Sequence, residues 1–134
     1  MSDTPKELDW VNVRASCSLL SMFRSLEVAV ITDVEAAQSL PGGNPDRFKF
    51  QSHSGKSFSV TRMLDHSVPI GDAVVFSCEK DAIHVQWREY SSTTPMFTAT
   101  VTLDNDGNCK FRVGDQSLEQ WQVRRMALEK LLFG

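Results

Sequence analysis

Apolar and polar residues alternate through most of the stretch from residue 46 to residue 115. The pattern is clearest in RFKFQSHSGKSFSV, AVVFSCEKDAIHVQW and MFTATVTLDNDGNCKFRV, each of which has turn-forming residues near its middle. Successive side chains of a β-strand point to opposite faces, so this period predicts strands with one apolar and one polar face. Each segment is expected to form a β-hairpin, and three hairpins in sequence predict one antiparallel meander of six strands.

The same alternation predicts which strand residues face each other. In the first hairpin, a three-residue loop of His53, Ser54 and Gly55 keeps the phenylalanines on one side, with Gly55 in the left-handed conformation. The expected apolar pairs are Phe50 with Phe58 and Phe48 with Val60 in that hairpin, and Val74 with Trp87, Phe76 with Val85 and Cys78 with Ile83 around a turn at Lys80 and Asp81 in the second. The third hairpin is expected to set Phe97, Ala99, Val101 and Leu103 against Cys109, Phe111 and Val113.

A helical period of three and four residues flanks the predicted sheet on both sides. Before the sheet, a helix is expected to begin at a cap formed by Thr4, to run from Leu8, to break around residues 16–18 and to end at LPGGNP. Its expected buried stripe is Ala15, Leu19, Met22, Phe23, Leu26, Val30, Val34 and Ala37. After the sheet, Ser117 and Gln120 form a capping box that predicts the start of a second helix. The side of this helix expected to be buried holds Leu118, Trp121, Leu128 and Leu132.

The fold class that follows is a single α+β domain over residues 1–134, a length that suffices for one core. It consists of a long N-terminal helix, a six-stranded antiparallel meander and a C-terminal helix. One face of the sheet is apolar, so both helices are expected on that face, in two layers. On the last helix, Arg125 is expected to lie over Trp121 or to pair with Glu129, whereas the pattern gives no role to Arg124.

Charge and cysteine content bear on the location and the partners. The net charge of −3 argues against general attraction to nucleic acid or anionic lipid. The N-terminal MSDTPKELDW lacks the features of a secretory signal, and no segment approaches the roughly 20 apolar residues of a membrane span. A cytoplasmic location without membrane contact is therefore expected. Cys17, Cys78 and Cys109 are odd in number and far apart, which favours reduced, structural thiols.

Patterns typical of catalytic and metal sites do not occur in the sequence. It contains no HExxH, no GxSxG, no phosphate-binding glycine loop and no dinucleotide fingerprint. Cys78 and Cys109 are expected to point inward and His84 outward, which separates thiol from imidazole. The DNDGNC turn does not have the ligand spacing of an EF-hand. No catalytic residue, metal or cofactor is therefore predicted; an active site, if there is one, is expected in the 63–72 loop around His66.

Two surfaces of the predicted fold are candidates for binding. The solvent face of the sheet is basic within an acidic chain, which suits phosphates or an acidic protein, but it lacks the aromatic residues on which single-stranded bases stack. Its candidate binding residues are Arg47, Lys49, His84, Arg88, Lys110 and Arg112. The second candidate is a pocket between the sheet and the helices, with a predicted lining of Phe58, Phe76, Trp87, Phe97 and Phe111.

Three classes of function are compatible with these surfaces. The favoured expectation is a small cytoplasmic interaction or assembly module, which acts through its surfaces, binds a protein partner or a second copy of itself, and is not an enzyme. The alternative is a nucleic-acid binder that uses the basic sheet face. A second alternative is a small-molecule binder or an enzyme with a cavity between sheet and helices.

Overall fold

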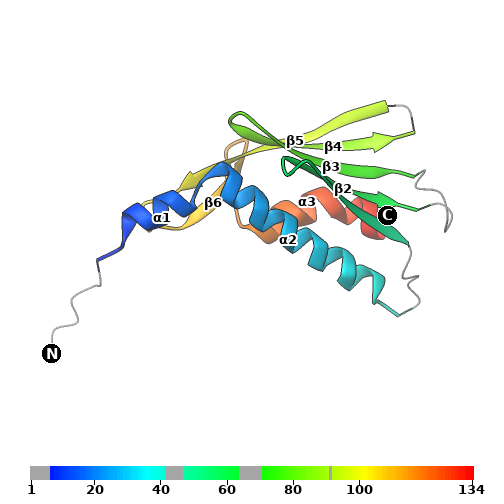
Figure 1. The fold of residues 1–134 in the computed structure, drawn as a ribbon, viewed down its shortest axis with the longest axis horizontal. Helices are drawn as coiled ribbons and strands as arrows, with labels where there is room; N and C mark the ends of the chain where they lie inside the picture. The colour runs from blue at the N-terminus through cyan, green and yellow to red at the C-terminus, as the bar shows by residue number, and fades with distance from the viewer. Residues whose placement is uncertain (1–6, 42–46, 64–70, 91) are drawn as a thin grey trace.

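The computed structural model describes residues 7–41, 47–63, 71–90 and 92–134. It has two layers, a twisted antiparallel sheet with helices α2 and α3 along one face, and α1 extends past the end of the sheet (Figure 1). The elements are α1 (Trp10–Ser16), α2 (Leu19–Gln38), β1 (Phe48–His53), β2 (Ser57–Arg62), β3 (Ala73–Glu79), β4 (Ala82–Glu89), β5 (Ser92–Leu103), β6 (Cys109–Val113), β7 (Gln116–Leu118) and α3 (Gln120–Phe133). The α+β class, the meander and the helices on one face of the sheet are as predicted.

The sheet has seven strands in sequence order, one more than the alternation predicts. The additional strand, β7, pairs with β6 and places Leu118 opposite Phe111. A left-handed Gly114, with φ of 60°, makes the short turn between these strands possible. Ser117 therefore lies in a strand, and the prediction that it caps the last helix is wrong. The residue before α3 is Glu119, whose backbone N–H donates to the side-chain Oε1 of Gln122 at 2.8 Å.

The registers of the hairpins agree with the prediction in the second hairpin and differ in the first. Between β3 and β4 the apolar pairs are Val74 with Trp87, Phe76 with Val85, and Cys78 with Ile83, as predicted. Between β1 and β2, Phe50 instead faces Val60 and Phe48 faces Arg62, a slip of two residues. The loop still has three residues but starts at Ser54, because Ser54 and Gly55 both take left-handed φ values of 53° and 73°. A slip of two keeps each side chain on its predicted face.

The core lies between the sheet and helices α2 and α3. From α2 it receives Phe23, Leu26, Val30 and Val34, the centre of the predicted stripe. On the sheet, the rings of Phe58 and Phe76 stack at 4.6 Å between centroids, and the ring of Phe23 lies 5.1 Å from that of Phe58. Interdigitated rings at these distances exclude water and supply much of the apolar burial that stabilises the domain.

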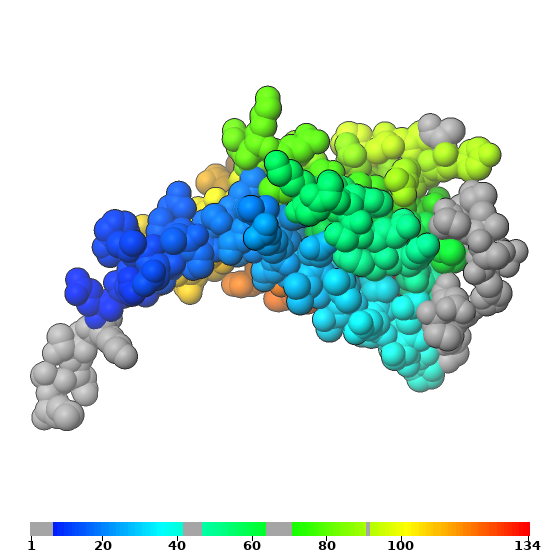
Figure 2. Space-filling view, in the orientation of Figure 1, coloured from blue at the N-terminus to red at the C-terminus, as the bar shows by residue number. Residues whose placement is uncertain are grey.

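The N-terminal helical region bends where the sequence predicts a break. Helices α1 and α2 meet at Cys17 with an angle of 62°, so α1 extends beyond the body of the molecule (Figure 2) and its Ala15 is exposed, not buried as predicted. Helix α1 begins at Trp10 after Asp9, whose Oδ1 accepts the Asn12 N–H, and not at Leu8. The predicted cap at Thr4 lies outside the described residues. Among the described helices, none is by itself long and apolar enough to cross a membrane, although α1 and α2 taken together pass that test.

Helix α3 buries a different set of residues from the predicted one. Leu128 and Leu132 are buried as predicted, and so is Leu118, which lies in β7 and not in the helix, but Trp121 is 53% exposed. The remaining buried residues of α3 are Val123, Ala127 and Leu131. The buried arc is centred on the line through Arg124 and Leu131, one heptad apart, so Trp121 falls at its edge and faces water.

Candidate functional site

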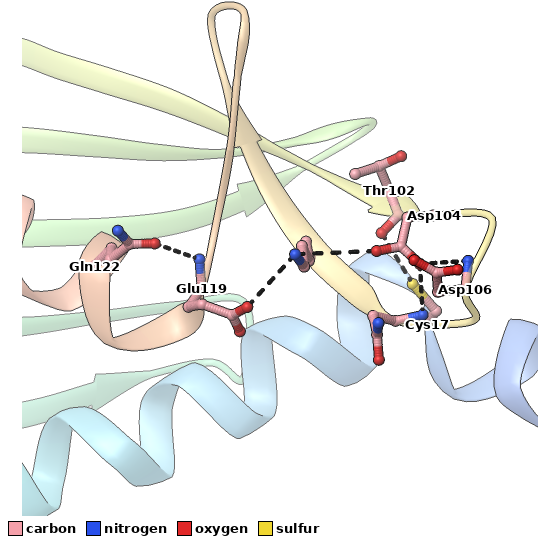
Figure 3. A network of polar contacts seen from close by, with 8 residues as sticks. Cys17, Thr102, Asp104, Asp106, Glu119 and Gln122 are labelled. Atoms are coloured by element: carbon pink, nitrogen blue, oxygen red, sulfur yellow. Dashed lines mark hydrogen bonds and ion pairs between the residues drawn. The ribbon is translucent and has the colours of Figure 1, made fainter.

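The six basic and histidine residues predicted to bind do not form one continuous patch. Lys49 and Arg88 share a cross-strand row on the outer face of the sheet, with Thr61 and Ala73 between them. Lys110 on β6 is instead held between two acids, with its Nζ 3.6 Å from Glu119 and 4.0 Å from Asp104 (Figure 3).

The remaining members of the predicted set have local partners. The Nε of Arg112 donates to the Gly114 carbonyl at 3.2 Å, and the Nδ1 of His84 lies 3.3 Å from the Oγ1 of Thr98. The guanidinium of Arg47 lies over the ring of Phe48, 5.2 Å from its centroid. Of the six residues, only Lys110 therefore has an acidic neighbour among these contacts. A binding role for the six residues stays a prediction.

The five aromatic residues predicted to line a pocket belong to the packed interior. Phe58, Phe76 and Phe111 have no accessible surface, Trp87 is buried, and Phe97 is partly buried against the core. The indole N–H of Trp87 donates to a carboxylate oxygen of Glu89 at 3.1 Å. The ammonium of Lys130 lies over the Trp87 ring, 4.7 Å from its centroid. The two grooves found on the described residues lie elsewhere, on helices α2 and α3.

Two of the three cysteines form a disulfide, which corrects the expectation of three reduced thiols. Cys17, at the bend between α1 and α2, is bonded to Cys109 at the start of β6, with their Cα atoms 5.5 Å apart. The free thiol is Cys78, whose pKa is raised by burial and lowered to a lesser extent by the nearby Lys56 ammonium. The pair was missed because the two cysteines are 92 residues apart and only the folded chain brings them together.

The turn between β5 and β6 is stabilised by one carboxylate. The Oδ1 of Asp104 accepts the backbone N–H groups of Asp106 and Asn108 at 2.9 and 2.8 Å (Figure 3). These hydrogen bonds, with Lys110 nearby, hold the pKa of Asp104 below its usual value. This is a turn-forming arrangement. Among the residues that the structure describes, no three His, Cys, Asp or Glu side chains gather to hold a metal ion, and His66 lies outside them.

Large apolar side chains are exposed on α1, at Trp10 and Val11, and on α3. Trp121 is 53% exposed and Phe133 is 69% exposed, although residues of this kind are usually removed from water. Two surface grooves run beside them. One, of about 560 Å³, lies between α2 and α3, and the other, of about 690 Å³, lies on the opposite flank of α3.

A single row of side chains separates the two grooves. Both grooves share the four residues Trp121, Arg125, Glu129 and Phe133. These residues are spaced by four along the helix, so they form one ridge of the type that packs into the groove of a neighbouring helix. We call this row the α3 ridge. It has an aromatic residue at each end and an ion pair, between Arg125 and Glu129, in the middle. The sequence predicts this ion pair but not the exposure of the aromatic residues.

The α3 ridge stands on a helix that is fixed to the rest of the fold. Arg124, to which the sequence pattern gives no role, points toward α2 in the groove beside the ridge, where its Nε donates to Asp33 at 2.7 Å. Its Nη1 also donates to Gln120 at 2.9 Å. At the other end of α3, Arg62 donates to the carbonyl oxygens of Leu131 and Gly134 at 3.3 and 3.2 Å. These hydrogen bonds fix α3, and with it the α3 ridge, to α2 and β2.

Comparison with known proteins found no matching family model, no similar curated protein and no similar solved structure.

Proposed function

We propose that this protein is a small assembly module that associates with a second copy of itself through the α3 ridge. The observation that carries the proposal is an exposed row with an aromatic residue at each end, flanked by a groove on each side. Ridges that pack into grooves are the usual way in which helices meet. The two grooves provide a place for the ridge of a partner, and no catalytic role is proposed.

The order of residues along the α3 ridge favours a second copy as the partner. Trp121 and Phe133 are equidistant from position 127, and so are Arg125 and Glu129. When two such ridges run antiparallel about a two-fold axis near that position, Trp121 lies beside Phe133 of the second copy and Arg125 beside its Glu129. A two-fold interface requires a surface that is complementary to itself in this way. The contact extends over about 18 Å of helix between the aromatic residues.

The rigidity of α3 supports the same proposal. Residues on a preorganised surface lose little conformational freedom on association, so more of the contact energy is available for binding. The contacts of Arg124 with α2, of Arg62 with the end of α3 and of Lys130 with Trp87 hold the helix before a partner arrives. Tryptophan and arginine, which are both in the ridge, are also the residues that most often dominate the energy of protein interfaces.

The test is the mass of the full-length protein in solution, measured by sedimentation equilibrium over a range of concentrations. We expect a dimer that becomes a monomer in Trp121→Glu and in Phe133→Glu, with an unchanged circular dichroism spectrum, because a carboxylate at the contact is buried without a partner. Tyr90→Glu is the matched control, since Tyr90 is an aromatic residue that is 90% exposed on the β4–β5 hairpin. A wild-type protein that stays monomeric at every concentration, or equal dissociation in the Tyr90 variant, would overturn the proposal.

A charge exchange tests the two-fold arrangement itself. In Arg125→Glu, four carboxylates meet at the centre of the interface, so the dissociation constant is expected to rise at least tenfold. Adding Glu129→Arg to the same chain restores opposite charges across the axis and is expected to return most of the affinity. A double variant as weak as the single one contradicts an antiparallel pairing of ridges.

The cytoplasmic location remains a proposal from the sequence, and the disulfide provides a way to test it. Disulfides persist mainly in oxidising compartments and are uncommon in the cytosol. Alkylation of the protein in its own cells, followed by mass spectrometry, distinguishes the cases. Alkylated Cys17 and Cys109 support the cytoplasm, whereas an intact bond between them supports an oxidising compartment.

A further inference from the structure

The first hairpin carries a local excess of positive charge. Between Arg47 and Arg62 the sequence has four basic side chains and no aspartate or glutamate, in a chain whose net charge is −3. Arg62 pairs with Asp72 at 2.8 Å, but Arg47, Lys49 and Lys56 are exposed along β1 and its turn. An acidic partner is therefore attracted to this side of the molecule.

Strand β1 is an edge of the sheet in the part of the chain that the structure describes. The Met63 N–H donates to the Arg47 carbonyl at 2.8 Å. The backbone N–H and C=O groups of the odd-numbered residues of β1 therefore bond to β2, and those of the even-numbered residues point away from the sheet edge. The first outward amide, that of Phe48, donates to the side chain of Gln38 at 3.2 Å. The next outward positions, Phe50 and Ser52, present backbone N–H and C=O groups to an approaching strand.

The two sides of β1 differ in the residues that they would accept. On the outer face Lys49 is exposed, and it favours an acidic residue on an added strand. On the helix face Phe50 is half-buried, with its ring 5.6 Å from that of Phe58, and it favours an apolar residue beside it. A complementary strand therefore alternates acidic and apolar residues with a period of two.

Pairing of β1 with β1 of a second copy is disfavoured by the same charges. An antiparallel pair of β1 strands brings Arg47 and Lys49 of both copies to one edge, and like charges on facing strands destabilise a sheet. Basic residues on an edge strand are a common means of preventing self-pairing. This repulsion does not act on an acidic segment, which is attracted instead.

We propose that β1 binds an extended acidic segment of another protein, which joins the sheet as an additional strand with acidic and apolar residues in alternation. Backbone hydrogen bonds along the edge provide the affinity, and Lys49 and Phe50 select the side chains. This site is separate from the one proposed for self-association, because it uses β1 and not the α3 ridge. It does not depend on the dimer.

The experiment uses fluorescence anisotropy of labelled peptides with the full-length protein. One peptide alternates glutamate with valine, and the control peptide has lysine in place of glutamate. We expect the acidic peptide to bind, with an affinity that falls as salt is added, and the basic peptide not to bind. Lys49→Glu is expected to weaken the acidic peptide about tenfold, since it replaces an attraction by a repulsion. Arg112→Glu, the same change of charge on β6, is expected to bind like the wild type.

Two further measurements test the backbone pairing. Ser52→Pro removes an outward N–H and is tolerated at an edge, so it is expected to abolish binding while the thermal midpoint stays near that of the wild type. An acidic peptide with N-methyl groups on those alternate amides that face β1 cannot complete the ladder, so it is expected not to bind, and this arm needs no change in the protein. Binding of the methylated peptide, or equal losses in the Lys49 and Arg112 variants, would mean general charge attraction and would overturn the proposal. Binding of a single-stranded DNA oligonucleotide in place of the acidic peptide would also overturn it, in favour of a nucleic-acid surface.

Discussion

Loss of the Cys17–Cys109 disulfide is expected to destabilise the folded protein strongly. The bond closes a loop between residues that are 92 positions apart. For a loop of this length, the chain-entropy relation gives about 4.6 kcal/mol of stabilisation at 25 °C, because the cross-link restricts the unfolded chain. Residual structure in the unfolded chain lowers this value, so we expect a loss of about 3–5 kcal/mol and a fall of roughly 10–20 °C in the thermal midpoint.

The assay is urea unfolding followed by circular dichroism, with and without a dithiol reductant. All samples carry Cys78→Ala, which prevents exchange with the free thiol. The control adds Cys17→Ala and Cys109→Ala, and its unfolding curve should not respond to the reductant. Mass spectrometry after alkylation verifies full reduction. A loss below about 1 kcal/mol in the fully reduced protein would refute the reasoning, because it would mean that the unfolded chain gains little freedom when the loop opens.

Three substitutions test other contacts by their effect on unfolding. Arg124→Ala removes the partly buried ion pair with α2 and is expected to lower the free energy of unfolding by about 1–2 kcal/mol. At protein concentrations low enough for the monomer to dominate, Arg125→Ala, at an exposed pair, should leave the urea midpoint nearly unchanged. Gly107→Ala introduces a side chain at a φ of 82° and against Leu8, so it should destabilise the protein by about 1 kcal/mol or more in the same assay. Because the pKa of Asp104 is lowered in the folded state, its carboxylate stabilises the fold at any pH above the usual pKa of aspartate. This stabilisation disappears as the pH falls through the pKa of the folded state. Urea midpoints across pH should therefore show Asp104→Asn less stable than the wild type at neutral pH and close to it in acid.

The sequence predicts the faces of the strands better than their exact pairing. In the β3–β4 hairpin the register is correct because a short turn at Lys80 and Asp81 leaves little choice of loop. In the β1–β2 hairpin a slip of two residues leaves every side chain on its face, so the apolar pattern cannot distinguish the two registers. The conformation of Ser54 decides between them, and a serine with positive φ is not evident from its type.

The features missed by sequence reasoning depend on long-range structure. The disulfide forms because the bend at Cys17 reaches the start of β6, and no local pattern encodes that distance. Trp121 has the spacing of a core residue, but the position of α2 beside Arg124 turns the buried arc away from it. One residue of the α3 ridge, Trp121, therefore belongs to the side of the helix that the spacing predicts to be buried. The basic residues of β1, in contrast, follow directly from the alternation.

The connection between β7 and α3 consists of the single residue Glu119, between Leu118 and Gln120. A connection of one residue keeps the first turn of α3 close to β7, and Glu119 also pairs with Lys110 of β6 at 3.6 Å. The ridge on α3 is thus joined through one residue to β7, through strand pairing to β6, and through Cys109 at the first residue of β6 to the bend between α1 and α2.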